Sequence, residues 1–223
     1  MSRKTAWMLP WLATLLGGCA GAIVEFKESD FPTPLVEVTD IDMGLVLDEE
    51  LTSYLHVEEI ERYGAWEVKL GLVQPLLFRN VLGAMFSSVT EVDSATEVHP
   101  DLDAVLVPSI IGFQISIPSQ TSSDLYEVWI KYRLRLYDNQ GELIVEWEFP
   151  AYGRANREDY RMLSDKDEPA LEDATMTALR DAAAEISLRF RDRPELKAWL
   201  AAQAARTTGV APEAEVDEGG ADS

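Results

Sequence analysis

The sequence contains very little cysteine and histidine, and these shortages limit the chemistry that the protein can perform. Its 223 residues include one cysteine, Cys19, and two histidines, His56 and His99. A single cysteine excludes a disulfide within the chain, so the hydrophobic core alone must stabilise the fold. Neither histidine has a partner at the spacing of metal ligands, so we expect no transition-metal site and no cofactor.

Basic charge and long hydrophobic runs are also scarce. The chain has 19 lysines and arginines against 40 aspartates and glutamates, a net charge of −21 at pH 7. This excess argues against a nucleic-acid partner and against electrostatic adsorption to anionic lipid. The apolar stretch over residues 5–16 contains Pro10 and is shorter than the roughly 20 residues that a membrane-spanning helix needs.

Recognisable catalytic and metal-binding motifs are missing as well. No serine lies in a Gly-x-Ser-x-Gly pattern and no glycine-rich phosphate loop is present, so the common nucleophile and nucleotide motifs are excluded. Asp40 and Asp42, with Glu37 and Asp48 nearby, could offer oxygen ligands to calcium, but they lack the regular spacing of a calcium-binding loop. We prefer to interpret them as a solvated strand edge, and we expect no enzymatic activity.

The amino terminus has the organisation of an export signal. Basic residues at positions 3 and 4 precede the short apolar stretch, and small residues follow it, as is typical of a secretory signal peptide. The motif Leu16-Gly17-Gly18-Cys19 resembles the lipobox of bacterial lipoproteins. This resemblance covers about the first 20 residues and implies that residues 1–18 are removed and that Cys19 is acylated. An ordinary signal peptide that ends near a buried cysteine is the alternative.

The lipobox resemblance also implies a location. Each buried methylene contributes about 0.8 kcal/mol, so two or more acyl chains, palmitate among them, would hold the protein firmly to a membrane. In bacterial lipoproteins an aspartate after the cysteine favours the inner membrane, whereas Ala20 stands here. The resemblance therefore implies the periplasmic face of the outer membrane in a bacterium with two membranes, with the lipid bilayer as the first partner.

Sequence patterns divide the rest of the chain into three parts. Residues 19–34 show little periodicity and are predicted to be a tether, and residues 35–206 are long enough for a single domain with its own core. Residues 207–223 are small and acidic and are predicted to be a disordered tail.

The clearest pattern is a three-stranded antiparallel meander over residues 103–149. Apolar side chains alternate with polar ones along each strand, which indicates one buried face. The predicted inward residues are Val105, Val107, Ile111, Phe113, Ile115, Ile117, Tyr126, Val128, Ile130, Tyr132, Leu134, Leu136, Leu143, Val145, Trp147 and Phe149. If residues 138–141 form the whole second loop, Leu136 lies opposite Leu143 and Tyr132 opposite Trp147.

Other segments complete an α+β fold. Strands are predicted at 35–47 and 65–71, with an irregular acidic stretch over 48–63 and a helix at 74–87. A polar loop at 150–165 precedes a long helix from Pro169 and a shorter one at 195–206. The apolar stripe of the long helix comprises Leu171, Ala174, Ala178, Leu179, Ala182, Ile186 and Phe190. We expect a single domain, with helices on one face of a mostly antiparallel sheet.

The order of these elements resembles that of small periplasmic lipoproteins that assist envelope machines. Examples are the lipopolysaccharide-assembly lipoprotein and the auxiliary lipoproteins of ABC transporters. The resemblance lies in element order alone, and no family motif can be placed on individual residues here.

One candidate binding surface lies on the outward face of the middle meander strand. It carries Trp129, Lys131, Arg133, Arg135 and Tyr137, and antiparallel pairing places Gln114 near Trp129. In the simpler interpretation, Glu146 beside Arg133 and Glu148 beside Lys131 neutralise an ordinary solvent face. Exposed tryptophan with arginine is also typical of interface hot spots, so a protein partner, a glycan or a lipid headgroup could dock there.

These observations favour a non-enzymatic, membrane-anchored periplasmic lipoprotein that binds or scaffolds an envelope protein. Two alternatives stay open. An envelope hydrolase acting on glycan or lipid would need a cleft with two opposed carboxylates or a serine–base pair. A carrier of a small ligand or lipid would need a sizeable apolar cavity between sheet and helices.

Overall fold

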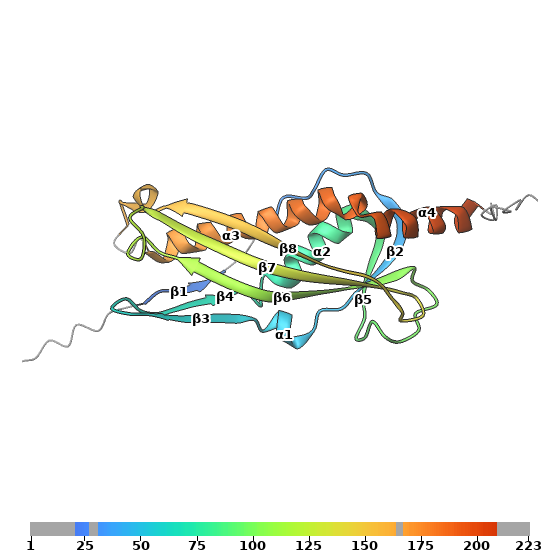
Figure 1. Ribbon diagram of the computed structural model, residues 1–223, viewed down its shortest axis with the longest axis horizontal. Helices are drawn as coiled ribbons and strands as arrows, with labels where there is room; N and C mark the ends of the chain where they lie inside the picture. Colours follow the sequence, from blue (N-terminus) through green and yellow to red (C-terminus); the bar gives the residue numbers. More distant parts are fainter. Residues whose placement is uncertain (1–20, 27–30, 164–166, 209–223) are drawn as a thin grey trace, which may run out of the picture.

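The structure is a computed structural model that describes residues 21–26, 31–163 and 167–208. The predicted signal peptide, Cys19 and nearly all of the predicted acidic tail lie outside these residues. The described chain forms two β-sheets and four α-helices, which confirms the predicted α+β class. Figure 1 shows an elongated domain whose longest strands run along its long axis.

The larger sheet has five strands. They are, in spatial order, β5 (Phe86–Glu91), β2 (Thr39–Leu45), β6 (Ala104–Ser116), β7 (Leu125–Asp138) and β8 (Leu143–Asn156). The strands β6, β7 and β8 form the predicted antiparallel meander. Because β2 pairs in parallel with both β5 and β6, the sheet is mixed.

A smaller sheet lies beside it and corrects two predictions. Its strands are, in order, β1 (Ile23–Glu25), β4 (Gly64–Lys69) and β3 (Leu55–Ile60). The sequence predicts a tether over residues 19–34, yet β1 pairs in parallel with β4 and its Val24 is fully buried. The stretch predicted to be irregular, 48–63, holds α1 (Glu49–Thr52) and β3. The strand β3 is hard to recognise from the sequence because most of its side chains are exposed or half-buried, and only Ile60 is buried.

Strict alternation along β7 builds the main core. All six predicted inward residues of β7 are buried, from Tyr126 to Leu136. The helices α2 (Gln74–Met85) and α3 (Asp167–Arg189) help to cover this core. The hydroxyl of Tyr132 donates a hydrogen bond to Oε1 of Gln74 at 3.0 Å, and burial raises the pKa of Tyr132 far above its ordinary value.

The strand β8 is longer than predicted because small residues continue its pattern. Where the sequence predicts a loop from residue 150, Ala151, Gly153 and Ala155 point inward and are buried. A Cβ added to Gly153 would lie 2.0 Å from the carbonyl oxygen of Ala174 in α3. The helix and the strand therefore touch through their backbones, which leaves no cavity at this point. The predicted apolar stripe of α3 and its continuation at Phe190 is buried throughout.

The pairing of β7 with β8 differs from the predicted register by two residues. Leu136 lies opposite Val145 rather than Leu143, and Tyr132 lies opposite Phe149 rather than Trp147. The turn contains three residues, 139–141, since Asp138 and Glu142 are hydrogen-bonded, and the ladder shifts once more beside Tyr137. Each change moves the register by one residue, so the inward and outward faces are unchanged except at the strand end, where Leu143 is exposed.

A β-bulge at Ile111 corrects the predicted face of the first half of β6. The pairing of β6 with β7 shifts between Ile110 and Gly112, because one extra residue lies in β6. Before the bulge, Leu106 and Ile110 face the main core, while Val105 and Val107 belong to a separate small cluster on the other side. After the bulge, Ile115 and Ile117 face the main core, as predicted.

The two ends of the domain carry different parts of the chain. One end holds the start of β1, the β3–β4 turn, the β6–β7 loop and the short 3-10 helix η1 (Arg157–Tyr160). The other holds the β7–β8 turn and α4 (Pro194–Thr208), which follows the short turn η2 (Phe190–Asp192) (Figure 1).

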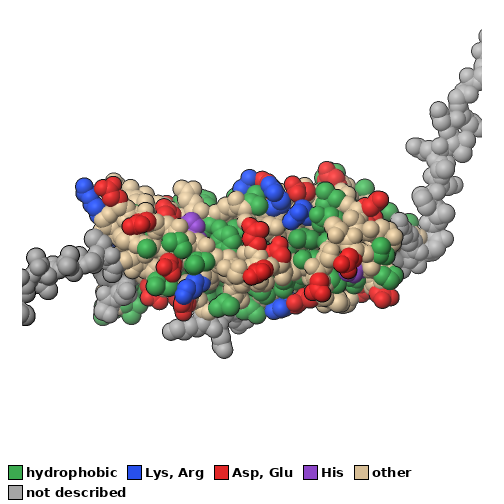
Figure 2. Space-filling model, turned by 90° about the horizontal axis from the view of Figure 1, so that it is seen from below, with side chains coloured by type: hydrophobic (Ala, Val, Ile, Leu, Met, Phe, Trp, Pro, Cys, Tyr) green, Lys and Arg blue, Asp and Glu red, His purple; other side chains and the backbone are tan. Residues whose placement is uncertain are grey.

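Within the described ranges no helix is long and apolar enough to cross a membrane. Acidic side chains are spread over much of the face shown in Figure 2, where basic ones are few.

Candidate functional site

The outward face of the meander brings several of the predicted residues together. Trp129 lies between Gln114 of β6 and Tyr152 of β8, which confirms the predicted proximity of Gln114 and Trp129. In the next outward row, Lys131 lies between Gly112 and Pro150. The candidate surface is therefore continuous across three strands.

A shallow hollow of about 250 Å³ opens in this surface. It is lined by Gly112, Phe113, Gln114, Trp129, Ile130, Lys131 and Pro150. Gly112 follows the β-bulge and has no side chain, and an added Cβ would meet only the Cβ of Lys131, at 3.5 Å. The hollow exists because a glycine occupies an outward position between larger neighbours.

An aromatic pair, Trp129 and Tyr152, lies at one side of the hollow. The ring of Trp129 lies 5.2 Å from that of Tyr152, centre to centre, at an interplanar angle of 43°. The Tyr152 hydroxyl donates a hydrogen bond of 2.6 Å to Oε1 of Glu127, and this carboxylate raises the pKa of Tyr152. Tyr152 thus supports Trp129 from the edge strand. A loop prediction over residues 150–165 misses it, although its alternation with Ala151 and Gly153 signals a continuing strand.

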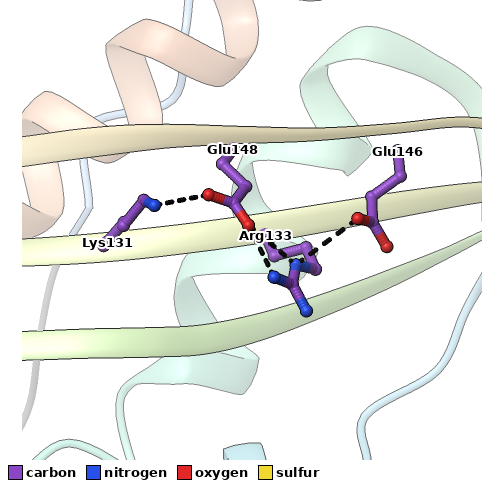
Figure 3. Close-up of polar contacts among 4 residues, drawn as sticks. All are labelled: Lys131, Arg133, Glu146 and Glu148. Atoms are coloured by element: carbon purple, nitrogen blue, oxygen red, sulfur yellow. Dashed lines mark hydrogen bonds and ion pairs between the residues drawn. The ribbon is translucent and has the colours of Figure 1, made fainter.

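Ion pairs occupy the next part of the surface (Figure 3). Glu148 binds both Lys131 and Arg133, with 2.6 Å between its Oε1 and Nη2 of Arg133. Nε of Arg133 also lies 3.6 Å from Oε1 of Glu146. Hydrogen bonds from Lys131 first, and then from Arg133, lower the pKa of Glu148. The predicted neutralisation occurs, although the shifted register places Arg133, and not Lys131, directly opposite Glu148.

Arg135 lies farther along β7 and does not reach the hollow. It is paired across the sheet with Val107 and Glu146. Its Nε is buried and has no hydrogen-bond partner among the described residues. The structure therefore separates the predicted residues: Gln114, Trp129 and Lys131 surround the hollow, and Arg133 and Arg135 lie outside it.

The composition of the hollow suits binding better than catalysis. Its lining contains one ionisable side chain, Lys131, and no carboxylate. The half-buried ring of Trp129 offers a flat apolar surface, while the amide of Gln114 and the ammonium group of Lys131 can form hydrogen bonds. Such a combination can hold an apolar or sugar-like group against the ring.

A larger groove of about 500 Å³ lies toward the opposite end, between α4 and the residues that lead into β2. Its lining comprises Glu37, Val38, Thr39, Asp40, Ile41, Arg191, Leu200, Ala201, Gln203 and Ala204. The guanidinium group of Arg191 binds the main-chain oxygen of Glu37 and the hydroxyl of Thr39. These contacts join η2 to the segment that leads into β2. Arg191 therefore has a structural role in the groove.

The residues considered as metal ligands have structural roles. Asp40 and Asp42 accept hydrogen bonds from Ser87 and Ser88, and so link β2 to β5. His56 packs its ring 4.6 Å from Phe113. Within the part of the chain that the structure describes, no group of three or more His, Cys, Asp or Glu residues could hold a metal ion.

Comparisons with known proteins show similarity in structure alone. No family model and no curated protein matches this chain. A Xanthomonas campestris protein of the DUF330 family is 10% identical, with 84% of this chain and 96% of that chain covered and a TM-score of 0.48. A candidate lipoprotein of Caulobacter crescentus is 17% identical, with 59% and 83% covered and a TM-score of 0.39. A minor lipoprotein of Acinetobacter baumannii is 10% identical, with 69% and 92% covered and a TM-score of 0.37. Similarity at this level carries no functional argument, so function rests on the chain's own residues.

Proposed function

We propose that this protein is a non-enzymatic lipoprotein, anchored by acylated Cys19 at the periplasmic face of the outer membrane, that binds an envelope protein. The observation that carries the proposal is the lone cysteine at the end of a lipobox-like motif, directly after a short apolar segment. Acylation accounts both for the presence of one cysteine and for its position.

The surface around Trp129 is the proposed contact with the partner. Support comes from the hollow beside Gly112, the aromatic pair of Trp129 and Tyr152, and the hydrogen-bonding groups of Gln114 and Lys131. Aromatic side chains in a partly enclosed setting are typical of the residues that dominate binding energy. The ion pairs around Glu148 would form the polar rim of such an interface.

Incorporation of labelled palmitate tests the anchor. The full chain expressed in a bacterium with two membranes is expected to acquire the label and to sediment with outer-membrane vesicles. Cys19→Ser removes the acceptor and should abolish labelling, whereas Gly17→Ala changes the motif but keeps the acceptor and should stay labelled. An unlabelled natural chain in the aqueous fraction would refute the proposal.

Crosslinking in intact cells, followed by capture of the protein, tests the binding surface. Trp129→Ala and Gln114→Ala should each reduce the yield of a specific crosslinked partner at least several-fold without changing the amount of folded protein. Leu143→Ala is the matched control, since Leu143 is an exposed apolar residue of β8 away from the hollow. Equal yields from all three variants would reject this surface as the contact.

A further inference from the structure

The end of the domain that carries β1 combines exposed apolar side chains with balanced charge. Its tip consists of the β3–β4 turn (residues 61–63), the β6–β7 loop (117–124) and the segment 157–163. Met162 is 90% exposed, Leu163 50% and Tyr63 41%. Met162 and Leu163 are adjacent in the chain, so together they form a small apolar patch at the tip that the described residues leave uncovered.

Contacts within the structure hold these segments at the same end as the start of β1. The carbonyl oxygen of Ala22 accepts a hydrogen bond of 2.9 Å from the amide of Glu67 in β4. The Trp66 ring of β4 lies 6.1 Å from that of Tyr126, at the beginning of β7. The amide of Arg157 donates a hydrogen bond of 2.8 Å to the carbonyl oxygen of Asp124, which joins η1 to the β6–β7 loop. Figure 1 shows β1, the β3–β4 turn and the end of β8 gathered at one end of the long axis.

Charge differs between this tip and the loops at the opposite end. The tip contains three arginines against four carboxylates. The loops 92–103 and 139–142 contain five carboxylates and no lysine or arginine. The segment 190–208, also at that end, carries four basic residues against two acidic ones, so charge alone does not select one end. The near-balance of charge at the tip lets it approach an anionic membrane surface without strong repulsion.

Chain length places the tip next to the proposed anchor. Cys19 and Ile23 are four residues apart, a separation that a fully extended chain spans in at most about 14 Å. A lipid attached to Cys19 would therefore bring the β1 end of the domain to the bilayer surface. No other end of the elongated domain can be as close.

From this geometry we infer that the tip rests on the lipid bilayer, with Met162 and Leu163 among the headgroups and Arg62 and Arg161 beside lipid phosphates. The inference rests on the proposed acylation of Cys19. It identifies a second contact with the membrane, formed by the folded domain, that fixes the domain's long axis away from the surface and leaves the Trp129 hollow free.

Single-cysteine labelling of the full, acylated chain in vesicles of phosphatidylethanolamine and phosphatidylglycerol tests the inference. Met162→Cys provides a unique thiol at the tip, and Leu143→Cys provides one at the opposite end, where Leu143 is 54% exposed. With an environment-sensitive fluorophore, lipid-attached nitroxide should quench the label at 162 several-fold more than the label at 143. Aqueous iodide should show the reverse order.

The outcomes separate this inference from the proposed function. Equal quenching at 162 and 143, in a protein that floats with the vesicles, would overturn the membrane contact and leave the anchor intact. Protection of position 162 from both quenchers would indicate a protein neighbour and would also overturn it. If the natural chain takes up the fluorophore at Cys19 and does not float with vesicles, the anchor fails and the inference fails with it.

Discussion

The two faces of the β6–β7–β8 meander differ in burial and in their contribution to stability. On the inward face of β7 every second residue from Tyr126 to Leu136 is buried, and these side chains pack against helices and the smaller sheet. On the outward face, Trp129, Lys131 and Arg133 contact neighbouring strands and solvent. The same backbone therefore carries a face that stabilises the fold and a face whose side chains can change with little effect on it.

This difference indicates which residues are suitable for testing a binding function by substitution. Substitutions on the inward face alter packing, so their effects on binding cannot be separated from effects on folding. Substitutions of Trp129, Lys131 or Arg133 on the outward face leave the main core intact, so a change in binding can be attributed to the surface itself.

Truncation of a large inward residue should have the greatest effect. Tyr132→Ala leaves a cavity and removes the hydrogen bond to Gln74, so the free energy of unfolding should fall by about 3–5 kcal/mol. The outward substitution Trp129→Ala should cost less, because it removes an aromatic pair worth about 0.5–1.5 kcal/mol and only the partial burial of a half-exposed side chain. Urea unfolding followed by circular dichroism measures both, and equal losses would show that the two faces do not differ in this way.

A smaller effect is expected where α3 meets β8. In Gly153→Ala the new methyl group would overlap the backbone of α3, so the free energy of unfolding should fall by about 1–3 kcal/mol. Gly83→Ala in α2 is the control, because an added Cβ has no neighbour within 4 Å, and it should stabilise the helix by up to about 1 kcal/mol. Thermal unfolding should show a lower melting temperature for Gly153→Ala and a higher one for Gly83→Ala. An unchanged melting temperature in Gly153→Ala would mean that β8 and α3 can move apart at little cost.

The smallest effect on stability is expected from the outward ion pairs. Because the folded pKa of Glu148 is lowered, any stability from this group is present above its ordinary pKa and is lost as the pH falls through the folded pKa. Lys131→Ala and Arg133→Ala should each raise the pKa of Glu148 toward its ordinary value, Lys131→Ala by more, while the urea midpoint stays nearly unchanged at neutral pH. Carbon-detected NMR titration of the carboxyl group measures the shift. A large loss of stability in either variant would show that this solvated face contributes to folding.

The sequence predicted the faces of β7 and β8 better than their register or ends, and it assigned the wrong face to the first half of β6. Alternation identified the inward side of β7 and the stripe of α3, because burial on one face imposes a period that can be counted. The pairing of Tyr132 with Phe149 could not be predicted, since it depends on a three-residue turn and a one-residue shift that have no period. The extension of β8 was missed because Ala151 and Gly153 are small, and their reason for being small lies in a helix more than 20 residues away.

The same limits apply to the candidate site. The proximity of Gln114 and Trp129 followed from antiparallel pairing and is confirmed. The alternation of β6 already places Gly112 on the outward side, with Gln114. The hollow beside it could not be predicted, because it depends on the larger side chains that the neighbouring strands place around this glycine. Its supporting residue Tyr152 required knowledge that β8 continues past Pro150.

The extra residue at Ile111 reverses the inside and outside of β6 partway along its length. Odd-numbered positions such as Val105 and Val107 face outward before it, whereas Ile115 and Ile117 face inward after it. Deleting one residue at this point would turn one half of the strand over relative to the other, burying polar atoms or exposing apolar ones. A related protein that lacked one residue here would have to exchange the polar and apolar positions of half the strand at once. The length of β6 should therefore vary less among related proteins than its composition does.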